Sequence, residues 1–175
     1  MQQRTQGFVF SLGMFTLFLL AIMARPSFAQ ESEDALSKNS LYLELGGNAL
    51  VYSINYDRIL SNAFSVRGGI GYYSLEDDLE GGDNSVSLAA FPLTLNYLLG
   101  SGSSRLELGA GLVILTGSAD LGGVSTSNAS VIGTATFAYR YQKPMGGIFF
   151  KAGFTPFISG GSFIPWFGLS VGYTL

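Results

Sequence analysis

The stretch Phe167-Gly-Leu-Ser-Val-Gly-Tyr-Thr-Leu175 decides the fold. Large apolar residues occupy its odd-numbered positions, and glycine, serine or threonine occupies every even-numbered one. This strict period of two is that of a β-strand with one apolar face and one small or polar face. In water such a strand would leave an apolar face and an open edge exposed. In a bilayer the same strand fits a closed barrel, with apolar residues toward lipid and small polar ones toward the lumen. The stretch therefore predicts a transmembrane β-barrel.

The composition agrees with many strands joined by tight turns. The 175 residues, one domain's worth, include 24 glycines and 14% aromatic residues, and only 12% of them are charged. The chain has no cysteine and no histidine. A disulfide framework and a thiol nucleophile are therefore excluded.

The first 29 residues have the organisation of a secretory signal peptide. Arg4 supplies the positive charge, residues 8–24 form an apolar run, and Ser27-Phe28-Ala29 fits the small-x-small cleavage rule. We expect a mature chain that begins at Gln30, with residues 30–39 as a short periplasmic segment. An uncleaved membrane anchor is the alternative, and the run is short for that role.

The charge of the mature chain argues against nucleic acid as a partner. The signal segment contains Arg4 and Arg25 and no acidic residue, so its removal takes the net charge from −3 to −5. An acidic surface repels a phosphate backbone.

Residues 40–175 are expected to form an all-β fold, an eight-stranded antiparallel up-and-down barrel with both termini in the periplasm. Short turns near residues 60–63, 100–103 and 142–146 alternate with longer polar stretches at 74–85 and 116–127, which we interpret as outer loops. The first and last outer loops, near residues 46–49 and 158–162, are expected to be brief. The eight predicted strands are 40–47, 50–60, 63–74, 85–99, 104–115, 128–142, 147–157 and 163–175.

Strand parity assigns almost every charge within a strand to the lumen side. Because the interior of an eight-stranded barrel is just wide enough for side chains, these charges are expected to pair with one another and plug it. The predicted lumen charges are Glu44, Asp57, Arg67, Arg105, Glu107, Arg140 and Lys151.

The same parity turns four tyrosines outward, each near the periplasmic end of its strand. An aromatic girdle at that level of the membrane is typical of such barrels. The predicted girdle consists of Tyr56, Tyr97, Tyr141 and Tyr173.

At this point the sequence resembles the small eight-stranded outer-membrane proteins of the OmpA-barrel and OmpX type, and more closely uncharacterised Bacteroidota-type outer-membrane barrels. The resemblance covers about residues 40–175. It implies the barrel architecture and no common activity, and the terminal Leu175 departs from the phenylalanine that commonly ends the group. The motifs that carry it are Glu44-Leu-Gly-Gly-Asn48, Ser53-Ile-Asn-Tyr-Asp-Arg58, Tyr139-Arg-Tyr141 and Gly153-Phe-Thr-Pro156.

Small inward residues in the outer half of the barrel suggest two readings. They would leave a small cup, open outward, unless Tyr42, Tyr73 and Leu88 fill it, or they permit the curvature of a tight barrel, which we favour. These small residues are Gly69, Gly71, Gly109, Gly111, Gly153, Gly168 and Ser170.

Neither catalysis nor dedicated metal binding is predicted. A serine without a neighbouring base is a weak nucleophile, and the inward carboxylates have cations beside them that keep them ionised. The outer stretch with Glu76, Asp77, Asp78, Glu80 and Asp83 lacks the spacing of a calcium loop and is expected to be a solvated acidic loop. No cofactor, catalytic residue or metal site is therefore assigned.

Together these patterns predict a monomeric integral barrel in the outer membrane of a Gram-negative bacterium, with a structural or surface-interaction role. Its expected partners are outer-membrane lipid and lipopolysaccharide, and the barrel-assembly machinery during biogenesis. Two alternatives stay open. One is a narrow pore or small-ligand-binding barrel, and the other is a soluble periplasmic carrier of lipocalin shape, which would need a polar outer face.

Overall fold

The computed structural model describes residues 38–77, 84–121 and 124–175, and their side chains except those of residues 75–77, 84, 120, 121, 124 and 125. All of these residues belong to one compact unit, Asp34–Leu175. The predicted signal peptide, and the periplasmic segment up to residue 37, lie outside the described residues. No helix within the described ranges is long and apolar enough to cross a membrane.

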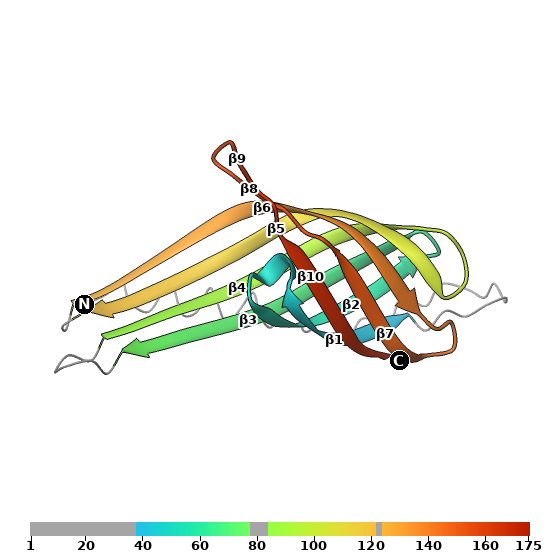
Figure 1. The fold of residues 1–175 in the computed structure, drawn as a ribbon, viewed down its shortest axis with the longest axis horizontal. Coiled ribbons are helices and arrows are strands. Elements are labelled where there is room, and N and C mark those ends of the chain that lie inside the picture. The colour runs from blue at the N-terminus through green and yellow to red at the C-terminus, as the bar shows by residue number, and fades with distance from the viewer. Residues whose placement is uncertain (1–37, 78–83, 122–123) are drawn as a thin grey trace. The chain divides into compact units, whose positions relative to one another are not determined.

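The described chain folds as a closed antiparallel β-barrel, as predicted (Figure 1). Consecutive strands pair as hairpins, and the barrel closes where β1 pairs with β10, from Ser40 opposite Thr174 to Gly46 opposite Gly168. The strand segments are β1 (Asn39–Gly46), β2 (Tyr52–Ser61), β3 (Phe64–Asp77), β4 (Asn84–Leu99), β5 (Ser104–Leu121), β6 (Val124–Gln142), β7 (Gly147–Phe154), β8 (Phe157–Ser159), β9 (Ser162–Ile164) and β10 (Phe167–Thr174), with a 3-10 turn η1 (Gly47–Ala49) between β1 and β2.

Prolines account for the difference between these ten segments and the eight expected strands. β7 and β8 are one pass of the chain interrupted at Pro156, and β9 and β10 are one pass interrupted at Pro165. Proline has no N–H to donate to a neighbouring strand, so each ladder breaks there. The two passes nevertheless stay hydrogen-bonded to each other at the break, because the Thr155 N–H donates to the Trp166 carbonyl at 2.8 Å.

The prediction of long polar outer loops at residues 74–85 and 116–127 is wrong. β3 and β4 stay paired out to Asp77 opposite Asn84, and β5 and β6 stay paired out to Leu121 opposite Val124. The strands β3 to β6 are therefore 14 to 19 residues long, whereas about 9–11 residues span a membrane. They project as two long hairpins past the ends of the other strands (Figure 1).

The polarity of the two barrel faces reverses where these hairpins begin to project. Within the barrel wall, β4 turns Leu95 outward with 55% exposure and buries Asn96 inside. Beyond the buried Ala90, the same parity places Ser87 outward and Leu88 inward. On β4, and on β5 where Leu115 lies inward and Ser118 outward, apolar residues thus face outward in the wall and inward in the projecting part. That is the arrangement expected where a strand passes from lipid into water. On β6 the inward side of the projecting part is polar, with Ser130 and Asn128 opposite Leu115 and Gly117.

The outward apolar residues of the wall form a continuous belt, which we call the apolar belt. It includes exposed leucine, isoleucine, valine or aromatic side chains on every long strand of the barrel. Representative members are Leu43, Ile54, Val66, Leu95, Leu112, Phe137, Phe150 and Val171, exposed between 37% and 59%. Such an area would be exceptional on a soluble monomer.

A pair of glycine substitutions tests how tightly the wall is packed. A Cβ atom added at Gly153 would lie 2.6 Å from the Phe137 carbonyl oxygen, whereas one added at Gly117 would come no closer than 3.8 Å to any neighbour. We expect Gly153→Ala to destabilise the folded barrel by about 1–3 kcal/mol and Gly117→Ala to have little effect. Urea unfolding of the refolded protein in lipid vesicles measures both, and equal midpoints would contradict the packing.

Candidate functional site

The barrel interior holds seven charged side chains contributed by six strands. Six of them are at most 2% exposed, and Arg105 is 9% exposed. They are Glu44 on β1, Asp57 on β2, Arg67 on β3, Arg105 and Glu107 on β5, Arg140 on β6 and Lys151 on β7. All seven are the residues that strand parity assigns to the lumen side.

Arg140 and Glu107 are the centre of one ion-paired group. The Arg140 guanidinium donates to Asp57 at 2.8 Å and to Glu107 at 3.1 Å, and the other Glu107 oxygen accepts from Lys151 at 3.2 Å. These contacts connect β2, β5, β6 and β7 across the interior. Each carboxylate therefore has a cation within hydrogen-bonding distance, as a buried charge requires.

Arg67 is the centre of a second group. Its guanidinium forms an ion pair with Glu44 and donates to the Asn55 side-chain oxygen at 3.0 and 2.8 Å. It also donates to the Asn48 side-chain oxygen at 2.6 Å. Ser170 on β10 donates to the second Glu44 oxygen at 3.1 Å. This group therefore crosses the seam between the first and last strands.

Asn48 comes from the turn η1, which folds into the barrel. Its amide donates to the Thr134 hydroxyl at 2.6 Å, and the side chain is fully buried. The next residue, Ala49, is also fully buried and packs with Ala90, Val113 and Phe157 in an apolar cluster. This cluster covers the charged groups on the side of the projecting hairpins. The brief loop predicted at residues 46–49 is thus short, and it acts as a lid.

The cup considered from the sequence is absent from the described interior, because its expected space is filled. Tyr73 contacts η1, with its hydroxyl bound to the Ala49 carbonyl and accepting from the Val51 N–H at 3.2 Å. A Cβ added at Gly69 would come within 3.0 Å of the Asn55 amide carbon, and one added at Gly109 would come within 3.2 Å of the corresponding atom of Asn96. These glycines make room for side chains from the neighbouring strand.

Tyr42 and Phe149 form an aromatic stack between the two ion-paired groups. Their rings lie 4.6 Å apart at 19°, and Gly172 lies in register between the two residues. The Lys151 ammonium lies 5.0 Å from the Tyr42 ring centroid, and the Arg140 guanidinium lies 5.0 Å from that of Phe149. The stack thus shields cations from one another while contacting them through its ring faces.

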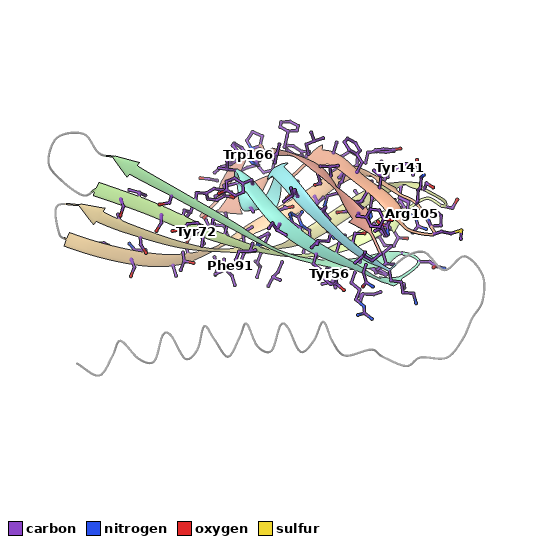
Figure 2. All side chains as sticks on the ribbon, turned by 90° about the horizontal axis from the view of Figure 1, so that it is seen from below. Tyr56, Tyr72, Phe91, Arg105, Tyr141 and Trp166 are labelled. Carbon is purple, nitrogen blue, oxygen red and sulfur yellow. The ribbon has the colours of Figure 1, made fainter. Side chains whose placement is uncertain are left out.

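Arg105 lies apart from these groups, close to the end of the barrel where β1 begins and β10 ends. It donates to the Asn62 carbonyl at 2.9 Å and to the Gly102 carbonyl at 3.4 Å. It therefore connects the β2–β3 turn to the β4–β5 turn. Figure 2 shows Arg105 and Tyr141 at this same end.

The four tyrosines expected in a girdle all lie on the outward face. Tyr97 and Tyr173 are 41% and 57% exposed, and Tyr56 and Tyr141 are half-buried. The Tyr56 hydroxyl donates to the Asn39 side chain at 2.8 Å. Of the acidic stretch, residues Asp78, Glu80 and Asp83 lie outside the described residues, and so do the side chains of Glu76 and Asp77.

Sequence reasoning missed the amides that organise the interior. Asn48, Asn55 and Asn96 are all fully buried. The sequence contains a signal for two of them. Asn55 and Asn96 each directly precede an outward tyrosine, in the repeated pairs Asn55-Tyr56 and Asn96-Tyr97. Each of these asparagines is paired in register with a glycine on the next strand, Gly69 and Gly109 respectively.

The chemistry available to this interior is that of a structural network. Its three carboxylates are each ion-paired, and none is more than 1% exposed. Among the described residues, no group of three or more acidic side chains is placed to share a metal ion.

Solved structures with a similar fold include the N-terminal β-barrel domain of OprF from Pseudomonas aeruginosa. The TM-score is 0.55 at 18% identity, over 78% of this chain and 97% of that domain. The fold is that of a small outer-membrane β-barrel. The attachment invasion locus protein Ail of Yersinia pestis gives a TM-score of 0.48 at 11% identity, over 78% of this chain and 93% of that one. Neither the family models nor the curated proteins yield a match to this sequence.

Loss of one buried carboxylate tests the ion-paired interior. Glu107→Gln keeps the size of the side chain but leaves Arg140 short of one partner and Lys151 without its carboxylate. We expect a loss of roughly 3–5 kcal/mol in the free energy of unfolding in vesicles. Adding Lys151→Met to this variant removes the stranded ammonium and is expected to restore part of the loss.

The exposed Lys143→Gln serves as the control and is expected to stay within about 0.5 kcal/mol of the unsubstituted protein. If Glu107→Gln unfolds at the same urea concentration as this control, the buried pairs do not stabilise the barrel.

Proposed function

We propose that this protein is an integral outer-membrane barrel with a closed interior, whose role is structural or is exercised through the surface of its projecting hairpins. The observation that carries the proposal is the reversal of polarity along β4 and β5. The apolar belt suits lipid, and the outward serines and threonines beyond it suit water. The termini would then lie in the periplasm and the projecting hairpins outside the cell.

The closed interior favours this role over a pore or a small-ligand carrier. A conducting path needs a continuous column of water, and the described lumen is occupied by ion pairs, an aromatic stack and the η1 lid. A soluble carrier would need a polar outer wall, whereas the outward residues of this wall are apolar. The filled lumen and the apolar outer wall therefore support the closed membrane barrel over these two alternatives.

The projecting part supports a surface-interaction role. Its inward face continues the apolar cluster with Leu88 and Leu115, both half-buried, and reaches Val86, which is 48% exposed. The short strands β1, β2, β7 and β10 end below this level, so they leave the face uncovered (Figure 1). An uncovered face whose apolar part lies on β4 and β5, bordered by polar residues of β6, is typical of an interaction surface.

The test is to express the full chain with its signal, isolate the outer membrane, and compare boiled and unboiled samples in SDS gels. A closed barrel resists detergent, so we expect outer-membrane protein that changes mobility on boiling. Recovery from the periplasm with no mobility change would contradict the proposal and favour the carrier.

Conductance separates the closed barrel from the pore. The refolded protein in a planar bilayer is expected to give no steady openings, because charged groups and η1 occupy the lumen. Regular openings of uniform size would instead establish a pore.

A further inference from the structure

The pass of chain from β8 to β9 is unlike the other hairpins because it is short, apolar and uncharged. No charged side chain occurs from residue 152 to Leu175. The hairpin turns at Gly160 and Gly161, both with positive φ, which a two-residue hairpin turn requires. It exposes Ile158 by 50% and Phe163 by 60%, and these two residues are paired in register.

The position of this hairpin relates it to the apolar belt. Ile158 pairs with Gly133 of β6, and Gly133 pairs with Leu112, an outward belt residue that is 54% exposed. The hairpin therefore leaves the wall from within the belt and turns away from it (Figure 1). Its pairing with β6 ends at Ile158, and an exposed apolar hairpin of three residue pairs gains stability from a surface that covers it.

An apolar groove of about 520 Å³ lies in the belt beside the base of this hairpin. Ala152 and Gly153 form its floor, and its walls include the aromatic rings of Phe137, Tyr139, Phe154 and Phe167. Ala152 pairs with Tyr139 on one side and with Leu169 on the other, so a small residue is set among large ones. The hollow follows from that difference in size.

The groove is joined to the hairpin by aromatic contacts. Phe154 lies 5.3 Å from Phe167 and 6.1 Å from Phe163 of β9, measured between ring centroids. The Tyr139 hydroxyl, the polar atom of the aromatic walls, is already bonded to Ser104 at 2.8 Å. The groove therefore offers an occupant a long apolar surface without an open hydrogen-bonding or charged group.

From these observations we propose that the β8–β9 hairpin lies in the acyl region of the membrane and that the adjoining groove binds one acyl chain of a membrane lipid. The proposal rests on the membrane placement given under Proposed function. A lipid chain suits the groove because the groove is continuous with the apolar belt and shares its lack of charge.

The chain contains a single tryptophan, and it lies beside this site. Trp166 precedes the groove residue Phe167, is 37% exposed, and donates its ring N–H to the Leu50 carbonyl at 3.0 Å. Figure 2 shows it away from the end that carries Arg105 and Tyr141. Its fluorescence therefore reports on the hairpin without any substitution.

The first measurement uses the mature protein refolded into phosphatidylcholine vesicles with brominated acyl chains. We expect strong quenching of Trp166 by the bromine atoms and little quenching by aqueous iodide. Quenching by iodide alone would place the hairpin in water and overturn the proposal. Protection of Trp166 from both quenchers, together with a dimer by light scattering, would show that a second copy of the chain covers the hairpin. That result would also overturn the proposal.

The second measurement tests the groove itself. Ala152→Phe fills the floor, and Val66→Phe adds the same ring at an exposed outward position of β3, a strand that contributes no residue to the groove. In detergent, brominated lipid is titrated into each protein and the half-quenching concentration is recorded. We expect Ala152→Phe to raise it about fourfold or more, the equivalent of one methylene group's burial, and Val66→Phe to leave it unchanged.

Equal titrations for the two variants would overturn the groove as a lipid site. The outcome is separable from failure of the membrane placement, because a protein that is not an outer-membrane barrel would also lack the mobility change on boiling. If the protein keeps this mobility change but Trp166 is quenched by iodide, the lipid-site proposal for the hairpin and groove is refuted and the outer-membrane placement stands.

Discussion

The narrowness of an eight-stranded interior is the constraint on which the rest of this structure depends. Several large inward side chains have a small residue beside them on the neighbouring strand. Gly172 lies between Tyr42 and Phe149, whose rings stack above it, and Ser170 lies between Glu44 and Lys151. The small inward residues of the last strand are therefore the complement of the aromatic stack and the charged groups.

A consequence of this complementarity is that no charged residue of the interior can be replaced by a neutral one without affecting its partners. Arg140 contacts two carboxylates and an aromatic ring, and Glu107 contacts two cations. Removing any member leaves a partner in a space that water does not readily reach, and the cost of that stranded charge exceeds the value of the pair.

Strand parity was sufficient to predict the barrel and the side of each charged residue, because a period of two assigns faces without reference to distant contacts. It was not sufficient for η1. That turn requires a left-handed conformation at Leu50, with φ of 78°, and its place in the lumen depends on contacts of Asn48 with strands far along the chain. The long hairpins were missed for another reason. Residues 116–127 are rich in serine, threonine and glycine, a composition that predicts a loop, although Ser118 outward and Ala119 inward continue the alternation with its polarity reversed.

The seam between β1 and β10 has a consequence for the order of events during folding. Ser40 and Thr174, which share a hydrogen bond there, are separated by 134 positions in sequence. The hairpins from β2 to β6 join neighbouring segments and can form early, whereas the seam must wait until the last strand is available. Until then the edges of β1 and β7 are both unpaired, and each is a template for another chain. The intermediate most exposed to misassembly is thus an open sheet that lacks only its final strand, and its lifetime is set by the arrival of residues 167–174.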